Sequence, residues 1–291
     1  MNVIRNLFVL LCMCMACCFT HAQENLDLKG TSCVPVKAVT EEDLAFKAGE
    51  RMDFVLHYKW GAINTDVGNA TVSLDTLTYN GHKSVLCSVY GKTTKMFDIF
   101  FKVREDFKSW FTRDGLKPLK FTRDTYEGGY EARNTYHYNW AAADPQIEAE
   151  VYSSKKGTRF LQIPLTRCTL DLPALFFYAR NMDFDAVEPG RKYPMTFAID
   201  DDVYNVYFIL YGKETIKVKG LGSVNTIKFA AKLLEGEVFK GEEDMLIWVT
   251  DDENRLPVYF EAPLLVGTAS GRMTGWEGLK HPFTSLVQKK K

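Results

Sequence analysis

This sequence contains little cysteine, has almost no net charge and lacks a long apolar run beyond its first 22 residues. Only three of its seven cysteines lie beyond these residues, and those three form no C-x-x-C pair, so neither a zinc knuckle nor a thioredoxin-like redox motif is indicated. The 36 basic and 37 acidic side chains nearly cancel, so the basic surface of a nucleic-acid-binding protein is missing. With 46% hydrophobic and 25% charged residues, the chain is typical of a folded globular protein. We predict no transmembrane helix after residue 22, because no window of about 18 apolar residues follows it.

The first 22 residues have the pattern of a secretory signal peptide. A basic residue precedes the apolar run Leu7–Phe19, which is too short to span a membrane, and small residues mark a cleavage site after Ala22. The alternative is a lipoprotein signal that is lipidated at Cys17, but Cys14 stands where such signals usually carry leucine. We therefore predict an exported protein, periplasmic or secreted, that is cleaved after Ala22 rather than anchored by lipid.

Three cysteines, Cys33, Cys87 and Cys168, lie beyond this segment. In an oxidising compartment Cys87 and Cys168 could form a disulfide that closes a long loop. The alternative, which we favour, is that all three are buried or unpaired thiols.

From residue 51 onward, apolar residues recur at every second position, which is the period of a β-strand with one buried face. Strands are expected at residues 52–59, 69–75, 107–111, 119–121, 135–140, 147–151, 195–199, 203–210, 216–218, 224–233, 245–250, 256–260 and 265–273. Turn dipeptides such as Asn80-Gly81 and Asp114-Gly115 separate several of them. Strands joined by such short turns must be antiparallel, so the pattern predicts a meander.

One segment has helical periodicity instead. Leu172, Leu175, Phe176 and Ala179 are spaced three and four residues apart, and Asp171 precedes them as a candidate helix cap. The sequence therefore predicts one short helix between two groups of strands.

About a dozen antiparallel strands must curl, because twist accumulates across a sheet. We therefore predict an all-β protein in which the antiparallel meander forms a closed or half-open β-barrel-like structure, with the one short helix plugging or covering it. Residues 203–210 are apolar on both faces, so we expect them to lie deep or beneath this helix. The expected divisions are a signal peptide at 1–22, a flexible lead at 23–42, a single barrel-like domain at 43–280 and a basic tail at 281–291.

Two acidic segments are interpreted as turns. Asp252 and Asn254 can bond to their own backbone and tolerate left-handed geometry, so they predict a structural turn in which Arg255 reaches a carboxylate. A calcium loop is the alternative, but the glycine and the distal glutamate of a helix–loop–helix calcium site are missing. The three adjacent carboxylates of Asp200–Asp202 repel one another and are expected in a solvated turn.

No catalytic or metal-binding motif is recognisable. The histidines, among them His57 and His137, form no H-E-x-x-H motif or other closely spaced ligand pair, so we predict no metal site and no cofactor. A G-x-S-x-G nucleophile elbow is absent too. Carboxylate pairs cannot be assigned from sequence, because 37 acids make chance pairs inevitable.

An aromatic stripe is the feature that points to a ligand. Tyr136, Tyr138 and Trp140 share one face of a predicted strand, and Tyr152 follows on the next. Flat rings with polar tips stack on sugars and line apolar pockets, so these four residues are the candidate ligand-binding set. The alternative, which we favour, is packing within the barrel, because strands are generally rich in aromatic residues.

Several short segments form a recognisable series along the chain: Phe46–Glu50, Val67–Ala70, Asp106 with Ser109 and Pro118, Trp248–Val258 and Val266-Gly267. Together they resemble the exported bacterial domain-of-unknown-function family 3108. The resemblance runs from about Phe46 to Gly278. It implies an all-β, barrel-like protein of the cell envelope without an established activity, and it supplies no catalytic residues.

Three functional hypotheses follow. The first is a non-catalytic binding or carrier module of the envelope for an apolar or glycan ligand. The second is a structural or protein-interaction module, and the third is a hydrolase with dispersed carboxylates. Lipid, glycan and another envelope protein are the partners considered.

Overall fold

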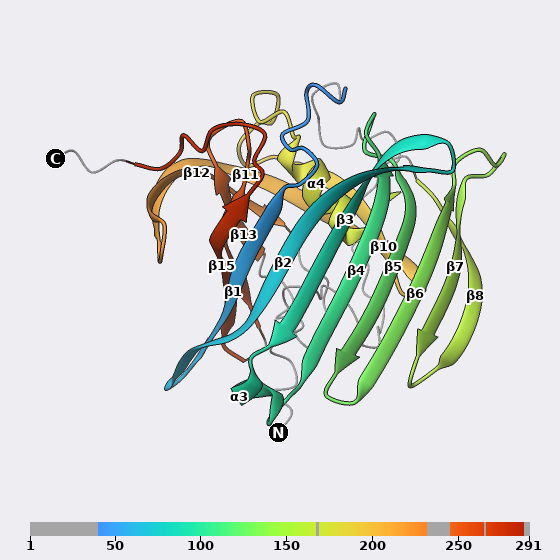
Figure 1. Ribbon diagram of the computed structural model, residues 1–291, viewed down its shortest axis with the longest axis horizontal. Coiled ribbons are helices and arrows are strands. Elements are labelled where there is room, and N and C mark those ends of the chain that lie inside the picture. The colour runs from blue at the N-terminus through green and yellow to red at the C-terminus, as the bar shows by residue number, and fades with distance from the viewer. Residues whose placement is uncertain (1–39, 167–168, 232–244, 265, 288–291) are drawn as a thin grey trace.

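A computed structural model describes residues 40–166, 169–231, 245–264 and 266–287 (Figure 1). The expected signal peptide and nearly all of the expected lead lie outside the described residues, as do Cys33 and Cys168. The proposed pairing of Cys87 with Cys168 therefore stays a prediction. Cys87 itself is a buried free thiol.

Fifteen strands form one sheet. They are β1 (Arg51–Trp60), β2 (Ile63–Tyr79), β3 (His82–Thr93), β4 (Val103–Thr112), β5 (Pro118–Glu127), β6 (Tyr130–Asn139), β7 (Gln146–Ser153), β8 (Gly157–Pro164), β9 (Thr169–Leu170), β10 (Lys192–Ile199), β11 (Asp202–Val218), β12 (Gly222–Ala231), β13 (Met245–Thr250), β14 (Pro257–Pro263) and β15 (Thr268–Glu277). Strands that follow one another in sequence pair with each other, except β8 and β9, and β1 also pairs with β15. All described pairs are antiparallel except β9 with β10. The predicted meander is confirmed.

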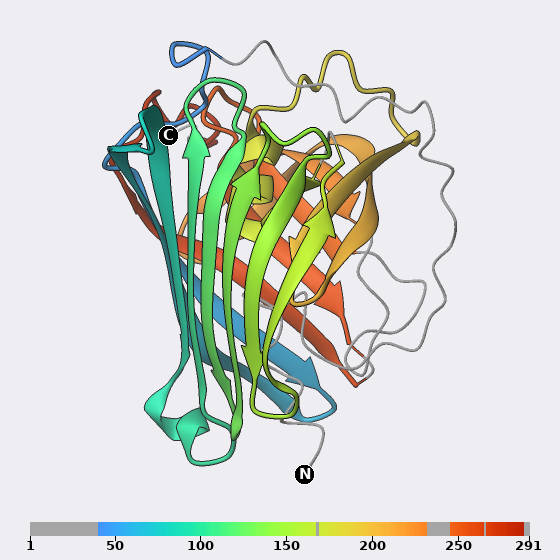
Figure 2. The same ribbon diagram turned by 90° about the vertical axis from the view of Figure 1, so that its right-hand side faces the viewer.

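The sheet curls around an interior but does not close into a barrel (Figures 1 and 2). Its two ends are β8 and β9, and no pairing between described residues joins them. Of the two predicted forms, the half-open one is therefore correct. The edge strand β9 has two residues, whereas β8 at the other edge has eight.

The predicted helix is α4 (Leu172–Arg180), which lies inside the curl against β3, β4 and β10 (Figure 1). Its cap is the expected Asp171, whose Oδ1 accepts a hydrogen bond from the Ala174 amide at 2.9 Å. A second helix, α3 (Lys95–Asp98), was not expected, because four residues are too few to display a helical period. Neither helix in the described part of the chain is long and apolar enough to span a membrane.

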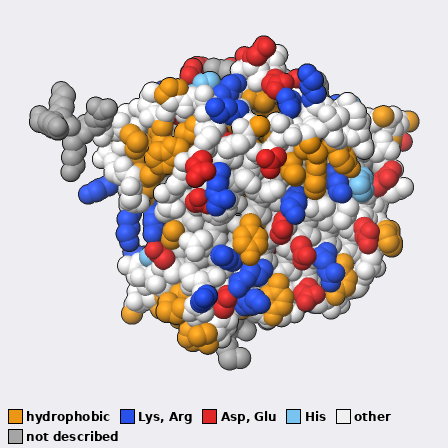
Figure 3. All heavy atoms as spheres, in the orientation of Figure 1, with side chains coloured by type: hydrophobic (Ala, Val, Ile, Leu, Met, Phe, Trp, Pro, Cys, Tyr) orange, Lys and Arg blue, Asp and Glu red, His pale blue; other side chains and the backbone are white. Residues whose placement is uncertain are grey.

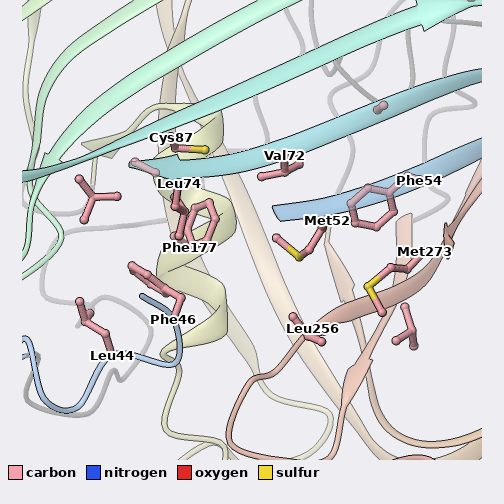
Figure 4. Packing of buried hydrophobic residues seen from close by; sticks show 14 of the residues in the cluster. Leu44, Phe46, Met52, Phe54, Val72, Leu74, Cys87, Phe177, Leu256 and Met273 are labelled. Atoms are coloured by element: carbon pink, nitrogen blue, oxygen red, sulfur yellow. The ribbon is translucent and has the colours of Figure 1, made fainter. Parts of the chain in front are cut away.

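The hydrophobic core gathers around α4 (Figure 4). The Phe177 ring on the buried face of this helix meets Phe46 edge to face at 4.7 Å and stacks with Phe111 at 6.0 Å. On β11, alternate residues from Tyr204 to Leu210 pack in a second cluster that includes side chains of α4. The expectation that residues 203–210 lie deep near the helix is thus correct.

Residues 281–287, the described part of the segment expected as a basic tail, pack against the sheet. Leu286 forms an antiparallel bridge with Val224, and the Phe283 ring lies 4.9 Å from Trp276. These residues lie against the sheet because their apolar side chains find apolar partners there. The folded unit therefore extends beyond residue 280.

Two glycines on β15 allow a matched test of packing. A Cβ atom added at Gly271 would lie 2.0 Å from the Phe260 ring, whereas one at Gly275 would have 3.8 Å to its nearest neighbour. We expect Gly271→Ala to lower the free energy of unfolding by about 1–2 kcal/mol, because the ring must move. Gly275→Ala should change it by less than about 0.5 kcal/mol. Urea denaturation followed by circular dichroism measures both, and equal effects would contradict the packing seen here.

Candidate functional site

Five polar side chains are buried together on the inner face of β4, β5 and β6. They are Glu105, Arg123, Thr125, Glu127 and Asn134, here called the polar cluster, and each is less than a tenth exposed. The register places them side by side, because Glu105 lies opposite Thr125 and Arg123 opposite Asn134. Alternation of side chains along each strand turns all five toward the interior.

A chain of hydrogen bonds connects the polar cluster. Arg123 Nε donates to Thr125 Oγ1 at 2.8 Å, and this hydroxyl donates to Glu105 Oε2 at 2.5 Å. The Arg123 guanidinium also lies over the Phe107 ring, 5.8 Å from its centroid. The arginine is therefore held by polar and aromatic neighbours at once.

The turn between β10 and β11 enters this cluster from the opposite side of the interior. Asp200 Oδ1 accepts hydrogen bonds from Arg123 Nη1 at 2.8 Å and from Asn134 Nδ2 at 3.0 Å. Asp201 Oδ2 lies 2.8 Å from Arg159 Nη1 and 3.5 Å from Lys156 Nζ. The expected turn is present and Asp202 is exposed, but Asp200 and Asp201 are only partly exposed because they pair with basic side chains. The repulsion among these carboxylates is offset by Arg123, Arg159 and Lys156 from distant parts of the chain, which the local sequence does not reveal.

The two glutamates of the cluster have strongly perturbed acidity. Burial raises the pKa of Glu105 well above its usual range, and the Glu127 carboxylate raises it further. Burial also raises the pKa of Glu127, which hydrogen-bonds to Glu105. The positive charge of Arg123 opposes both shifts. The pair therefore retains a proton at pH values where isolated glutamates are ionised, because two buried like charges in contact repel each other.

Three acceptor atoms of the cluster lack a donor. Glu105 Oε1, Glu127 Oε1 and Asn134 Oδ1 are shielded from solvent and have no hydrogen-bond partner among the described residues. Buried oxygen atoms in proteins nearly always accept a hydrogen bond from protein or water. Within the described residues, these three oxygens therefore have hydrogen-bonding capacity that no donor uses.

Two of the sequence-predicted ligand residues lie beside this cluster. Tyr136 is fully buried, and its hydroxyl donates to the Asp200 carbonyl at 2.7 Å. Tyr138 is also buried, and its hydroxyl lies 3.4 Å from Asp171 Oδ2 at the start of α4. Both tyrosines therefore face the interior and contact the elements that fill it.

The other two predicted ligand residues, Trp140 and Tyr152, lie in different surroundings. The Trp140 ring stacks on Tyr138 with 6.1 Å between centroids, so it continues the same row. Tyr152 lies on the outer phase of β7, where the Arg133 guanidinium covers its ring at 4.6 Å. The structure thus brings together Tyr136, Tyr138 and Trp140 and leaves Tyr152 on the other face of the sheet.

The segment expected as a structural turn holds several parts of the fold together. Asp252 Oδ1 accepts from Thr250 Oγ1 at 2.7 Å and from the Asn254 amide at 3.1 Å. The Asn254 side chain donates to the carbonyls of His281 and Pro282. Arg255, not Asp252 or Asn254, adopts the left-handed conformation, with φ of 51°. Its guanidinium lies 3.3 Å from Asp251 Oδ1.

The two histidines singled out in the sequence, His57 and His137, lie on the outer face of the sheet. His57 lies on the outer phase of β1, where Nδ1 is 2.8 Å from Asp66 Oδ1, and Asp66 in turn receives a bidentate contact from Arg272. His137 is exposed on the outer phase of β6. Within the described ranges, no group of three or more His, Cys, Asp or Glu residues could hold a metal ion.

The polar cluster was missed by sequence reasoning, although a signal for it exists. Glu105 has the same strand phase as the apolar Val103 and Phe107, and Arg123 has that of Phe121. A charged residue in the phase of buried aromatics must itself point inward. Alternation alone therefore locates these charges, but it does not show which partners they meet.

The fold and this buried site define a class of protein: an all-β, barrel-like structure built from one open antiparallel sheet around a helix. The family model described as "Protein of unknown function (DUF3108)" matches residues 53–274, and the chain belongs to this family. No curated protein matches the sequence.

Two solved structures are similar to the chain. A β-barrel-like protein of the domain-of-unknown-function family DUF1849 from Brucella abortus aligns with a TM-score of 0.53 and 12% identity, covering 80% of this chain and 98% of that one. A protein of Parabacteroides distasonis that is described as a candidate lipoprotein aligns with a TM-score of 0.34 and 11% identity, covering 85% of this chain and 100% of that one. The first similarity supports the barrel-like fold. The second is too low in TM-score to support any conclusion about the fold.

Proposed function

We propose that the protein is an exported, non-catalytic binding or carrier module that holds a hydroxyl-bearing ligand of the glycan type at the polar cluster. The observation that carries the proposal is the set of three buried acceptors, Glu105 Oε1, Glu127 Oε1 and Asn134 Oδ1, without a donor among the described residues. Each unsatisfied buried group costs about 1–3 kcal/mol. A ligand that donates O–H groups to these oxygens would remove that cost on binding.

Aromatic rings next to the acceptors favour a sugar over a purely polar ligand. Phe121 lies between Phe107 and Tyr136, with ring centroids 6.1 and 5.3 Å away. Sugars present hydroxyl edges and apolar faces together, and proteins hold them with acceptors and rings in the same combination. Export, which rests on the pattern of residues 1–22, would place the protein where envelope glycans occur.

A hydrolase fits this site less well. Glycosidases separate their two carboxyl groups by about 5–9.5 Å so that a sugar and a nucleophile fit between them. Glu105 and Glu127 instead act directly on each other, since each carboxyl shifts the pKa of the other. This arrangement is better suited to accepting hydrogen bonds than to cleaving a glycoside.

Ligand retention tests the proposal. We expect native mass spectrometry of protein purified from its own host, without detergent, to show a retained mass. Asn134→Leu should reduce the occupied fraction at least about tenfold, because one acceptor is lost at the centre of the site. The matched control is Asn139→Leu on the outer phase of the same strand, which should retain the mass.

Two outcomes would count against the carrier. One is the absence of any retained mass in every preparation. The other is equal retention by Asn134→Leu and Asn139→Leu when circular dichroism shows both variants folded.

A further inference from the structure

The tip formed by α3 and the residues after it exposes large apolar side chains. Met96, Ile99 and Phe100 are 57%, 81% and 66% exposed. Figure 3 shows apolar side chains gathered at the lower edge of the molecule, where Figure 1 places α3. Single exposed apolar residues are ordinary, but three within five positions mark an interaction surface.

The tip is mounted firmly on the sheet. Phe101 is buried, and Phe97 packs against the same hydrophobic cluster, which includes Tyr58 and Val67. Gly128 makes room for Phe101, since a Cβ atom there would lie 2.0 Å from the ring. Phe97 and Phe101 thus turn inward while Met96, Ile99 and Phe100 are held outward. Their exposure is a built feature of the fold rather than the result of a loose loop.

The charges around the tip are positive. Lys92, Lys95 and Lys102 are exposed beside the apolar residues. Asp98 is the single acid between Lys92 and Lys102, and Arg104 neutralises it through contacts of 2.5 and 2.9 Å. Hydrogen bonding from Arg104 lowers the pKa of Asp98 to about 2, so this pairing persists at neutral pH. The tip therefore presents apolar side chains ringed by unneutralised lysines.

A second apolar tip lies at the same end of the molecule. The hairpin between β1 and β2 exposes Trp60 and Ile63, with the exposed Lys59 beside them. Figures 1 and 2 both place this hairpin and α3 at the lower end of the sheet. Two separate tips with the same composition are better matched to an extended, deformable surface than to a single pocket on a protein.

We propose that this end of the protein docks on the surface of an anionic lipid bilayer. The apolar side chains at the two tips enter the boundary between headgroups and acyl chains, and the lysines meet the lipid phosphates. Interfacial binding generally combines buried apolar area with attraction between basic side chains and anionic lipids. The proposal depends on the surface alone and not on the identity of any ligand in the interior.

Co-sedimentation with vesicles tests this docking. We expect the protein to bind vesicles of phosphatidylglycerol mixed with phosphatidylcholine, and to bind pure phosphatidylcholine vesicles at least about tenfold more weakly. The triple variant Met96→Ser, Ile99→Ser, Phe100→Ser should lose at least about tenfold in partitioning to the mixed vesicles. Phe160→Ser removes a ring that is 76% exposed on β8, and as the matched control it should bind like the wild type.

A second variant separates the contribution of charge. Lys92→Gln, Lys95→Gln, Lys102→Gln leaves the apolar residues intact and should abolish the preference for phosphatidylglycerol. Because these lysines are exposed, this variant should fold even if the serine variant does not. The proposal is overturned if the wild type ignores both kinds of vesicle, as a protein-docking tip would, or if both folded variants bind as the wild type does.

Discussion

Replacing Arg180 by methionine is expected to lower the free energy of unfolding by about 3–5 kcal/mol. Arg180 ends α4, and its guanidinium contacts both carboxylate oxygens of Glu50 with almost no exposure of either side chain. It also donates through Nε and Nη2 to the Asn254 carbonyl at 3.1 and 2.9 Å. The variant leaves the Glu50 carboxylate buried without its counter-charge, which is why the expected loss is large. Urea denaturation followed by tryptophan fluorescence gives the value.

Arg51 provides the control for this prediction. Arg51 forms an ion pair with Asp53, which lies on the same strand, with 2.9 Å between Nη2 and Oδ1. Both side chains are nearly half exposed. Arg51→Met should therefore cost far less stability than Arg180→Met, because solvent screens an exposed pair. The double variant Glu50→Gln, Arg180→Met should recover part of the stability, because it removes the buried charge. Similar losses for Arg180→Met and Arg51→Met would show that the buried pair does not hold the helix in place.

The protein is expected to become more stable as the pH falls from about 7 to about 5, by at least about 2 kcal/mol. Burial raises the pKa of Asp171 to about 7, against about 3.9 in an unfolded chain. Between these values the folded state binds the proton more tightly, so the free energy of unfolding decreases as the pH rises through this range. Glu105 and Glu127 have pKa values raised by burial and contribute with the same sign. Urea denaturation at several pH values measures the effect.

The variant Asp171→Asn identifies the main contributor. Asparagine keeps an oxygen to accept from the Ala174 amide. At the other position, where Oδ2 accepts from Ser109 Oγ at 2.8 Å, it places an amide NH2 that can donate to this hydroxyl, and it does not titrate. The change in stability between about pH 7 and pH 5 should shrink by about 2 kcal/mol in this variant. Carboxylates with lowered pKa values, such as Asp53 and Asp98, lose their contribution only below about pH 4. An unchanged pH dependence in Asp171→Asn would refute the assignment.

Most of the fold could be predicted from residues that are close in sequence. Alternation of apolar residues located most of the strands, short turns fixed their antiparallel order, and Asp171 marked the start of α4. The strands β3 and β8 were not predicted, and the helix α3 escaped detection because four residues show no period. Whether the curled sheet closes depends on how the edge strands β8 and β9 meet, and local patterns contain no information about that.

The candidate site was harder to predict because its partners come from distant parts of the chain. Tyr136 and Tyr138 were correctly placed on one face by alternation, and Tyr152 was grouped with them only by proximity in sequence. Asp200 meets Arg123 across the interior, 77 residues away in the chain. A run of three aspartates predicts a solvated turn. The prediction changes only when the basic side chains that pair with Asp200 and Asp201 are seen in the folded structure.

The sheet is open between its edge strands β8 and β9, and side chains form contacts there. Among the described residues near this open edge, Asp201 forms ion pairs with Arg159 and Lys156, and Asp200 forms an ion pair with Arg123. Separating these ion pairs breaks no ladder of backbone hydrogen bonds, whereas parting any other two neighbouring strands would break several. Side-chain ion pairs therefore act at the open edge of the sheet where backbone hydrogen bonds act between the other strands.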